Sequence, residues 1–508
     1  MPHHTYDEFP YLCLIRPDIH PAQLATLTAL FTESPPLLDP CRILELGCGN
    51  GINLIAIAQS LPRATCLGID YSAKQIEDGQ KIIQETGLNN ITLQHLNILE
   101  FDDSFGLFDY ILIHGVYSWV PKQVRDKLLS ICHHHLAPRG IAYLSYNTYP
   151  GWYCNRITRE MLQYYHQQQF KSTAPIDVSA SQQLLELATI LNKDTRDAYT
   201  FVLEEQHSRL LQHDVENYLR HDLLEEVNHP FYFYQFLEHI KAYKLDYVTD
   251  VKFRDLLRES QHHLLSASPL HTHLFTDFFT QEQYLDFFFG RKLRMSVICH
   301  QGMSISRRLD STRLTKFYLA ATPQLRRYAK DKISSPLIQV AIHHLTEIYP
   351  HDIFFKDLLN HVCTHLSLTQ GEWTLTLASD LLDLYCSELI ELKIYPSQPF
   401  MTQLSTFPMV SPLARWQACH GHTTIVNLLG QIGQLDAFTC QLLPHLNGKN
   451  DYATLLKIVA ELVTKNSICL EEPNIALDQL PEQEREHILS LYLENVLAII
   501  SRYALLVG

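Results

Sequence analysis

The sequence lacks several features that mark common classes of protein. Its 12 cysteines are scattered singly, without a Cys-x-x-Cys pair, which argues against a zinc ribbon and a disulfide framework in a chain of 508 residues. We interpret them as mostly buried free thiols in a reducing compartment. The N-terminus has no basic region followed by an apolar stretch, so it shows no recognisable secretion signal. These features predict a cytoplasmic protein.

Positive charge is also scarce. The chain has 40 Lys and Arg against 55 Asp and Glu, which gives a formal net charge of -15. Proteins that bind the phosphate backbone usually display a basic face, so we expect no nucleic acid as partner, whereas a basic protein substrate stays compatible. The apolar run 491–508 contains Glu494 and Arg502, which favours an amphipathic or buried helix over a membrane span.

The most informative segment is Arg42 to Gly51, read as RILELGCGNG. It predicts a short apolar strand that ends in a turn with glycines at positions 47, 49 and 51. The first two glycines leave room for a ligand to approach the backbone, and the third lets a helix start close to the sheet. This pattern predicts a pocket for a nucleotide-type cofactor.

The spacing of the glycines separates two kinds of cofactor. The dinucleotide fingerprint needs a glycine at the sixth position of the turn, where this chain has Ile52, so NAD is the weaker alternative. Glu45 precedes the turn, and Asp70 closes the next predicted strand, followed by Tyr71. Glu45 suits the methionine ammonium of S-adenosylmethionine, directly or through water, and Asp70 suits its two ribose hydroxyls. We therefore expect S-adenosylmethionine as the cofactor.

The first part of the chain alternates between strand and helix patterns, which predicts an α/β fold with a Rossmann-like, doubly wound parallel sheet. The predicted strands are Arg42–Leu46, Thr65–Ile69, Ile91–His95, Phe108–Ile113 and Gly140–Tyr146. The predicted helices are Asn53–Ser60, Ala73–Thr86 and Pro121–His135. Ligands of such sheets bind at the carboxyl ends of the strands, so the segments that leave these strands are where we expect the site.

The rest of the chain predicts additional units. Consecutive helices precede two more strands, Leu245–Val251 and Lys292–His300, which we expect to complete the sheet. The predicted division is 1–165 with 228–310 for the cofactor domain, 166–227 for a helical insertion that dimerises the chain or covers the site, and winged-helix-like domains at 311–417 and 418–508. In the middle domain we expect three helices and a hairpin formed by Leu389–Tyr395 and Met401–Phe407. Since its Lys and Arg are sparse, protein docking or an architectural role is favoured over DNA binding.

Several longer runs resemble one known family. They are YDEFPY at 6–11, LELGCGNG at 44–51, GIDYSAKQIEDGQ at 68–80, FDYILIHGVYSWVP at 108–121 and SYNTYPGW at 145–152. The likeness continues through HDLLEEVNHPFYFYQF from His221 and RMSVICH to His300. These runs resemble class I methyltransferases with a methyltransferase regulatory domain, whose best-known members are the rickettsial outer-membrane-protein lysine methyltransferases. The resemblance implies methyl transfer to lysines of a protein, with an outer-membrane or surface protein as one possible substrate.

The candidate cofactor residues follow from the glycine turn and from this resemblance. Relatives usually have an Asp where this chain has Asn97, whose amide oxygen can still accept a hydrogen bond from the adenine amino group. Tyr6 is expected either to cap the cofactor or to anchor the N-terminal segment. The full candidate set is Glu45, Gly47, Gly49, Asn50, Asp70, Tyr71, Asn97, Ile98, His114 and Tyr6.

Methyl transfer from a sulfonium is an in-line displacement, so the enzyme must mainly align a neutral amine and exclude water. Aromatic side chains at two neighbouring strand ends, with Tyr149 among them, are expected to form a pocket for that amine, although such residues also serve as packing. The candidate catalytic residues are Tyr146, Asn147, Trp152, Tyr117, Trp119 and His114.

Four readings of function stay open. The leading one is a protein lysine methyltransferase, and the second is a methyltransferase of a small molecule or nucleic acid. The third is a regulator that binds S-adenosylmethionine, and the fourth is a docking scaffold. The run His133-His134-His135 lies on a predicted helix without a second ligand cluster, so no metal is expected. The sequence does not choose between a monomer and a homodimer.

Overall fold

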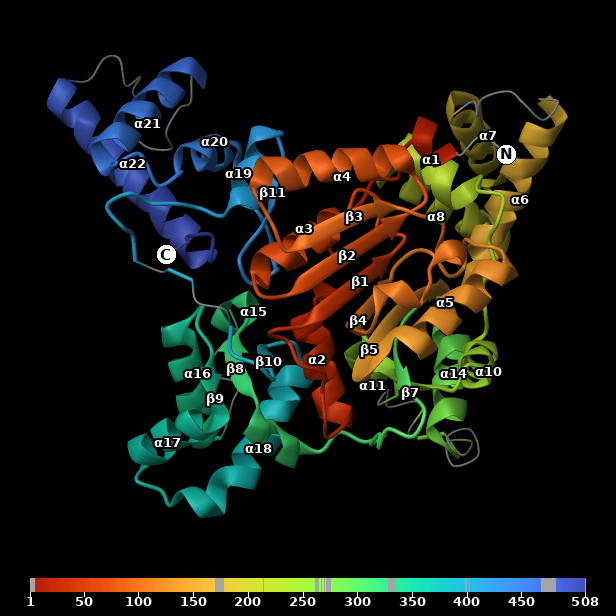
Figure 1. Cartoon of the computed structure of the whole chain (residues 1–508), viewed down its shortest axis with the longest axis horizontal. Helices are drawn as coiled ribbons and strands as arrows, with labels where there is room; N and C mark the ends of the chain where they lie inside the picture. Colours follow the sequence, from red (N-terminus) through yellow and green to blue (C-terminus); the bar gives the residue numbers. More distant parts are fainter. Residues whose placement is uncertain are drawn as a thin grey trace.

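The structure is a computed structural model of the chain. It describes all residues except 1–4, 170–177, 213, 261–264, 266, 269, 271–275, 328–334, 398–399, 402, 467–480 and 508. Figure 1 shows a central sheet between two layers of helices, with a helical unit at one side and two smaller units at the other.

The central sheet has seven strands in the order β3-β2-β1-β4-β5-β7-β6. Strands β1 to β5 are parallel, and β7 runs antiparallel to both of its neighbours. The sheet is therefore mixed, whereas the sequence predicted a parallel one. The strands are β1 (Arg42–Leu46), β2 (Thr65–Asp70), β3 (Ile91–His95), β4 (Phe108–Ile113), β5 (Leu136–Asn147), β6 (Leu245–Asp250) and β7 (Leu293–His300).

Most predicted elements of this region are confirmed. Three of the five predicted strands, β1, β3 and β4, have the predicted bounds, and β5 begins four residues early, at Leu136 instead of Gly140. The two late strands join the sheet beyond β5, as expected. Strands β1 and β4 are mainly apolar because they are buried on both faces between layers of helices, and this made them predictable from the sequence. The edge strand β3 instead alternates between buried Ile91 and Leu93 and exposed Thr92 and Gln94.

Two hydrophobic cores flank the sheet. One lies against α2, α3 and α4, and the other lies against α5 and α10. The bounds are α2 (Pro21–Phe31), α3 (Ile52–Ser60), α4 (Ala73–Thr86), α5 (Lys122–His135) and α10 (Phe233–Ala242). Shorter elements are α1 (Thr5–Glu8), η1 (Pro17–Ile19), η2 (Ile98–Glu100), η3 (Asp103–Phe105), α11 (Phe253–Ser260) and α14 (Phe278–Phe289).

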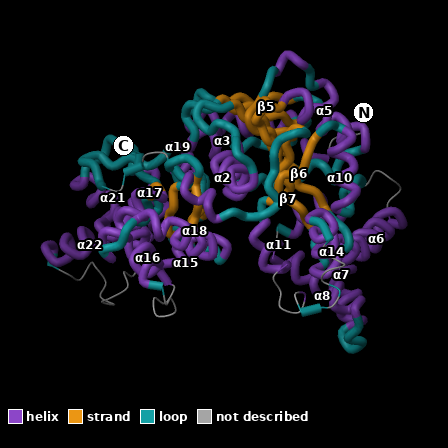
Figure 2. The backbone as a smooth tube through the Cα atoms, turned by 90° about the horizontal axis from the view of Figure 1, so that it is seen from below, coloured by secondary structure: helices purple, strands orange, loops and turns teal. Residues whose placement is uncertain are grey.

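The helical insertion lies between β5 and β6 and has a small core of its own, built on Leu162, Leu185 and Leu203. Figure 2 shows its helices as a separate group beside the sheet. They are α6 (Trp152–Gln169), α7 (Val178–Asn192), α8 (Ala198–Gln212), α9 (Val215–Tyr218) and the π-helical η4 (Leu219–Leu223). Helix α6 begins at Trp152, before the predicted boundary at 166. The division at 166–227 and a dimerising role stay predictions.

The middle unit contains the three predicted helices but not the predicted hairpin. Strand β10 pairs with β8 and not with residues 401–407, and Met401 instead forms a bridge with Leu506. The partner of β10 lies about 70 residues upstream, which local sequence cannot show. The elements are η5 (Ser311–Lys316), β8 (Tyr318–Ala321), α15 (Pro323–Arg327), α16 (Pro336–Ile348), β9 (Ile353–Phe354), α17 (Phe355–Leu366), α18 (Gln370–Cys386) and β10 (Ile390–Lys393).

The C-terminal unit packs against the cofactor domain through α4, where Trp416 Nε1 donates to Glu85 at 2.7 Å. Its elements are α19 (Pro412–Cys419), β11 (Thr424–Val426), β12 (Ile432–Gln434), α20 (Ala437–Leu442), η7 (Leu443–His445), α21 (Tyr452–Asn466) and α22 (Glu482–Arg502). Helix α22 buries Leu493, Leu497 and Ile500, as expected for the C-terminal run. Within the described part of the chain, none of the helices combines the length and the apolar character of a membrane span.

The late strand β7 is fixed by a buried ion-pair network. Arg294 is fully buried, pairs with Asp286 at 2.8 Å and Glu282 at 3.2 Å, and lies 3.9 Å from the ring of Phe233. Because Arg294→Met leaves buried Glu282 without a cation and Asp286 with Arg291 alone, we expect it to lower the free energy of unfolding by about 3–5 kcal/mol. Urea unfolding followed by tryptophan fluorescence measures this loss.

The control is Arg63→Ala, which breaks the exposed pair with Asp39 and should leave the urea midpoint unchanged. Equal midpoints for Arg294→Met and the parent chain would contradict the importance of the buried network.

Candidate active site at the carboxyl ends of the strands

The turn after β1 is a tight loop with left-handed backbone at three glycines. Their φ values are +73° at Gly47, +57° at Gly49 and +70° at Gly51. The amides of Gly47 and Cys48 both donate to the carbonyl of Ile69, at 2.8 and 3.1 Å, so the loop is fixed to the end of β2. The sequence therefore has glycine where the backbone conformation requires it.

The space around these glycines is filled by neighbouring segments of the protein. A Cβ atom on Gly47 would lie 2.4 Å from Val116, and one on Gly49 would lie 2.3 Å from the sulfur of Cys13. The close approach of Val116 and Cys13 is thus a second reason for glycine at positions 47 and 49. The sequence analysis had explained these two glycines by the approach of a ligand alone.

Asp70 connects the two halves of the candidate cofactor site. One of its carboxylate oxygens accepts from the Gly49 amide at 2.8 Å, and the other accepts from the Ser72 amide at 2.9 Å. These two hydrogen bonds hold the Asp70 carboxylate, which is predicted to bind the ribose, rigidly beside the glycine loop.

Glu45 is buried on the same side of the loop. Its Oε1 accepts from Asn53 Nδ2 at 3.0 Å, whereas its buried Oε2 has no hydrogen-bond partner among the described residues. Burial raises the pKa of Glu45 to about 8, with the charge of Asp70 acting in the same direction and Asn53 opposing. The carboxyl group is consequently mostly protonated at pH 7 until a cation approaches it.

The remaining predicted cofactor residues line the adjoining strand ends. Asn97 uses its amide oxygen to accept from the Leu99 amide at 3.0 Å, which leaves one lone pair of that oxygen for adenine. Tyr71 is exposed, and its carbonyl contacts His95 at 3.0 Å. Ile98 is half-buried beside them, and Asn50 accepts from the Ile52 amide at 3.1 Å within the loop. Their contact with a cofactor stays a prediction.

His114 directly follows β4. Its Nδ1 is 2.8 Å from the hydroxyl of Tyr143. Burial, with a smaller contribution from Arg16, lowers the pKa of His114 to about 3. The imidazole is therefore neutral at pH 7 and is a weak acceptor for a proton from an amine.

The loop after β4 and the end of β5 meet at Ser118 and Asn147. The backbone amide of Asn147 donates to Ser118 Oγ at 2.9 Å. The rings of Trp119 and Trp152 meet edge to face, with their centres 6.0 Å apart. Asn147 is 4% exposed, and its Nδ2 has no partner among the described residues. The structure thus brings together three predicted catalytic residues, Trp119, Asn147 and Trp152.

The other two aromatic candidates lie in the core below this site. Tyr117 and Tyr146 are 0% and 1% exposed and belong to the core beneath α10. Tyr146 stacks on Phe236 at 4.2 Å, and the Tyr117 hydroxyl bonds to His239. Helix α10 covers both rings, so their contacts are those of packing residues.

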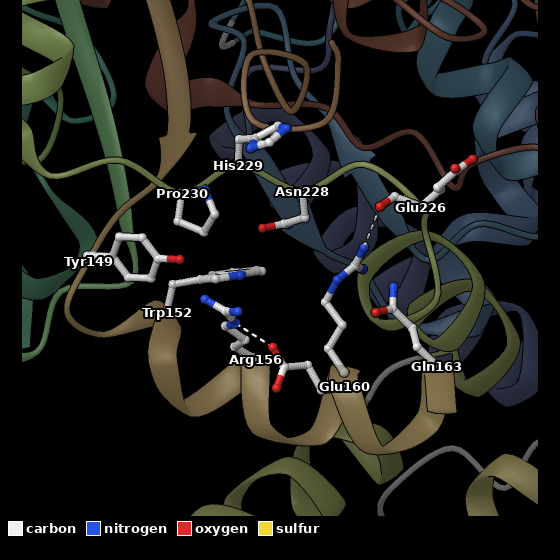
Figure 3. A pocket seen from close by; sticks show the side chains of 10 residues that line it. Tyr149, Trp152, Arg156, Glu160, Gln163, Glu226, Asn228, His229 and Pro230 are labelled. Carbon is white, nitrogen blue, oxygen red and sulfur yellow. Dashed lines mark hydrogen bonds and ion pairs between the residues drawn. The ribbon is translucent and has the colours of Figure 1, made fainter. Parts of the chain in front are cut away.

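A cavity of about 350 Å³ opens next to Trp152. Figure 3 shows the side chains of Trp152, Arg156, Glu160 and Gln163 rising from α6 toward the opposite wall. That wall is the segment 226–230, which includes Asn228 and His229. Arg156 is paired with Glu160 at 2.6 Å. The cavity is polar apart from Trp152, Tyr149 and Pro230.

Several residues of this region were missed by the sequence analysis. Asn53 holds Glu45, and Arg159 donates to the backbone carbonyls of residues 222, 223, 225 and 226. The sequence could have indicated a role for Asn53, because an amide side chain is unusual in the apolar helix INLIAIA. For Arg159 there was no such indication, since its partners are backbone atoms more than 60 residues away.

Three family models match the chain. A methyltransferase domain matches residues 44–142, a segment described as "Predicted methyltransferase regulatory domain" matches 215–300, and a C-terminal winged-helix domain of PKMT matches 407–505. An uncharacterised protein of Rickettsia prowazekii is 30% identical, covering 95% of this chain and 90% of that protein. A second one is 39% identical over 46% of this chain and 92% of that protein. The chain belongs to the class I S-adenosylmethionine-dependent methyltransferases with a regulatory domain.

The solved structures agree with this methyltransferase family. PKMT2 from Rickettsia typhi in complex with AdoHcy has a TM-score of 0.82 and 26% sequence identity, and the match covers 98% of this chain and 100% of that one. The methyltransferase fold and the winged-helix C-terminus predicted from the sequence are therefore confirmed.

The residues of this methyltransferase fit its cofactor. Glu45 Oε2 is a buried acceptor without a partner among the described residues, which a methionine ammonium can satisfy. Asp70 lies at the end of the neighbouring strand with acceptor positions for hydroxyl groups. Within the described residues, no group of three or more His, Cys, Asp or Glu side chains is arranged to hold a metal ion.

Asp70→Ala should weaken binding of S-adenosylmethionine by about 10- to 100-fold, because charge-assisted hydrogen bonds to the ribose are lost together with the anchor of Gly49. Isothermal calorimetry measures the affinity. The affinity of Asp70→Asn, which keeps one acceptor oxygen, should lie between those of the parent chain and Asp70→Ala. Unchanged affinity of Asp70→Ala would contradict the proposed position of the ribose.

Binding of the cofactor at pH 7 should release most of one proton, because Glu45 with a pKa of about 8 must ionise to meet an ammonium group. The release should vanish above about pH 9, where Glu45 is already ionised, and affinity should rise between about pH 6 and 9. Calorimetry in buffers of different ionisation enthalpy counts the protons. Glu45→Gln should bind more weakly and release none, and an unaltered release in this variant rules out Glu45 as the source.

Proposed function

We propose that the chain transfers methyl groups to lysine side chains of a protein and that the residues at the ends of β1, β2, β4 and β5 form its active site. The observation that carries the proposal is the cavity beside Trp152. Trp152 follows the carboxyl end of β5, and β5 is parallel to β4 and β1, so the cavity lies at the same edge of the sheet as the glycine loop after β1. The name of the R. typhi neighbour, PKMT2, supports the same substrate class. The free thiols among the described residues agree with a cytoplasmic reaction.

A lysine must be neutral to attack a methyl group. With a reference pKa of about 10.4, presenting it neutral at pH 7 costs about 4.6 kcal/mol at about 1.36 kcal/mol per unit. The lining of the cavity balances Arg156 and Arg159 against Glu160 and Glu226, so its side chains do not by themselves lower the pKa of an entering amine. S-adenosylmethionine supplies the methyl group and a positive charge that lowers this pKa, and removal of the amine from water acts in the same direction.

The aromatic walls suit the product of the reaction. Trp152 and Tyr149 present ring faces that can contact a methylated ammonium, which is worth about 0.5–2 kcal/mol. The Nδ2 atoms of Asn147 and Asn228 have no hydrogen-bond partner in the described part of the chain, and such donors suit carbonyl groups of the incoming polypeptide.

A small-molecule substrate is the alternative. A fully enclosed cavity would favour it, but this one includes exposed side chains at Arg156, Glu160, Glu226 and His229. An open cavity suits a side chain that projects from a larger partner. The net charge of -15 speaks against a nucleic acid as that partner. A surface or outer-membrane protein and a homodimer of the enzyme stay predictions.

The direct test uses methyl-labelled S-adenosylmethionine with the purified chain and with envelope and cytosolic fractions of its host, with Asp70→Ala as the blank. Protease-sensitive label that hydrolyses to methyl-lysine supports the proposal. Label that is nuclease-sensitive or stays in small soluble molecules contradicts it.

Trp152→Ala should lower turnover at least about tenfold while sparing cofactor affinity, because it removes a wall of the cavity but no contact of the glycine loop. Trp152→Phe should keep most of the activity. The control on the same helix is Tyr164→Ala, whose side chain is 64% exposed. Normal turnover of Trp152→Ala on the labelled protein would show that the substrate binds elsewhere.

A further inference from the structure

The N-terminal segment of residues 5–16, here called the N-terminal strap, lies along the whole candidate cofactor site. At one end, Asp7 Oδ1 accepts from Ser72 Oγ at 2.7 Å. In the middle, Cys13 Sγ lies 3.3 Å from Gln75 Oε1. At the other end, the Arg16 amide donates to Asn53 Oδ1 at 2.9 Å.

The strap thereby contacts the hydrogen-bond partners of both acidic cofactor residues. Ser72 donates its amide to Asp70, and Asn53 donates its side-chain amide to Glu45. Between them, Cys13 fills the space that a side chain at position 49 would occupy. Movement of the strap therefore alters the surroundings of both carboxylates.

The other side of the strap is held by the segment 217–225, which lies at the start of the match to the regulatory domain. The His221 ring stacks on Tyr6 at 4.8 Å and meets Tyr11 edge-on at 5.4 Å. The Arg220 guanidinium lies 3.6 Å from the centre of the Phe9 ring. Asn217 Nδ2 donates to the Pro10 carbonyl at 3.3 Å.

The segment 217–225 is in turn fixed to the substrate cavity. Arg159, which lines that cavity, donates to the carbonyls of Asp222 and Leu223 at 3.2 Å. One continuous set of contacts thus runs from the cavity through the segment 217–225 and the strap to the glycine loop. Aromatic stacking and cation–π contacts of this kind are directional and are lost together when the two surfaces separate.

We propose that His221 and Arg220 are positioning residues that hold the N-terminal strap closed over bound S-adenosylmethionine. The segment 217–225 then sets the rate at which the cofactor and its demethylated product leave the enzyme. The inference rests on the proposed position of the cofactor between Glu45 and Asp70.

The test measures dissociation of S-adenosylmethionine from the full chain by stopped flow after rapid dilution into excess competitor. His221→Ala and Arg220→Ala should each raise the dissociation rate about 5- to 30-fold. The Michaelis constant for S-adenosylmethionine should rise while kcat stays unchanged or increases, because neither Arg220 nor His221 lines the substrate cavity. His221→Phe, which keeps a ring for Tyr6, should restore slow release.

A double-mutant cycle separates a direct contact from a general loss of structure. If His221 acts through Tyr6, the pair Tyr6→Ala with His221→Ala should release the cofactor no faster than either single variant. The control is Arg258→Ala, which breaks the exposed pair with Asp255 far from the strap and should leave release unchanged. Additive effects, or release rates equal to those of the parent chain, overturn the proposal.

Calorimetry of Asp70→Ala together with the release rates separates a wrong cofactor position from a wrong role of the strap. If Asp70→Ala leaves affinity unchanged, the cofactor position is wrong and the strap proposal fails with it. If Asp70→Ala weakens binding but His221→Ala and Arg220→Ala release the cofactor at the normal rate, only the role of the strap is wrong.

Discussion

The hydrogen bonds of Asp70 to the amides of Gly49 and Ser72 are the constraint on which the site depends. They tie the glycine loop after β1 to the start of α4 and fix the distance between two neighbouring strand ends. Without that tie, a loop with three left-handed glycines would sample many conformations, because glycine restricts the backbone least. A single carboxylate thus orders the loop at the place where the ribose is predicted to bind.

Burial gives the second acidic residue a different role. Glu45 is buried next to Asp70, so its charged form is unfavourable until a cation arrives. A cofactor that carries both an ammonium and ribose hydroxyls satisfies both acids at once, whereas a dinucleotide brings a pyrophosphate toward two carboxylates. The same electrostatic logic extends to an entering amine, whose neutral form is favoured beside a cationic cofactor.

The sequence predicted well what depends on local pattern. Glu45 and Asp70 lie at strand ends as expected, since apolar strands bounded by glycine and acidic residues give a clear signal. It did not show that α10 covers Tyr117 and Tyr146, because that packing joins segments about 100 residues apart. Partners distant in sequence also explain the wrong hairpin at β10 and the unforeseen contact between His221 and the strap.

The most direct test of the central claim is hydrogen–deuterium exchange of the full chain with and without S-adenosylmethionine. Our account predicts that the cofactor slows exchange in residues 42–53 and 66–75, where the glycine loop and Asp70 lie, and in the N-terminal strap. Protection confined to other parts of the chain, with exchange in 42–53 and 66–75 unchanged, would contradict it.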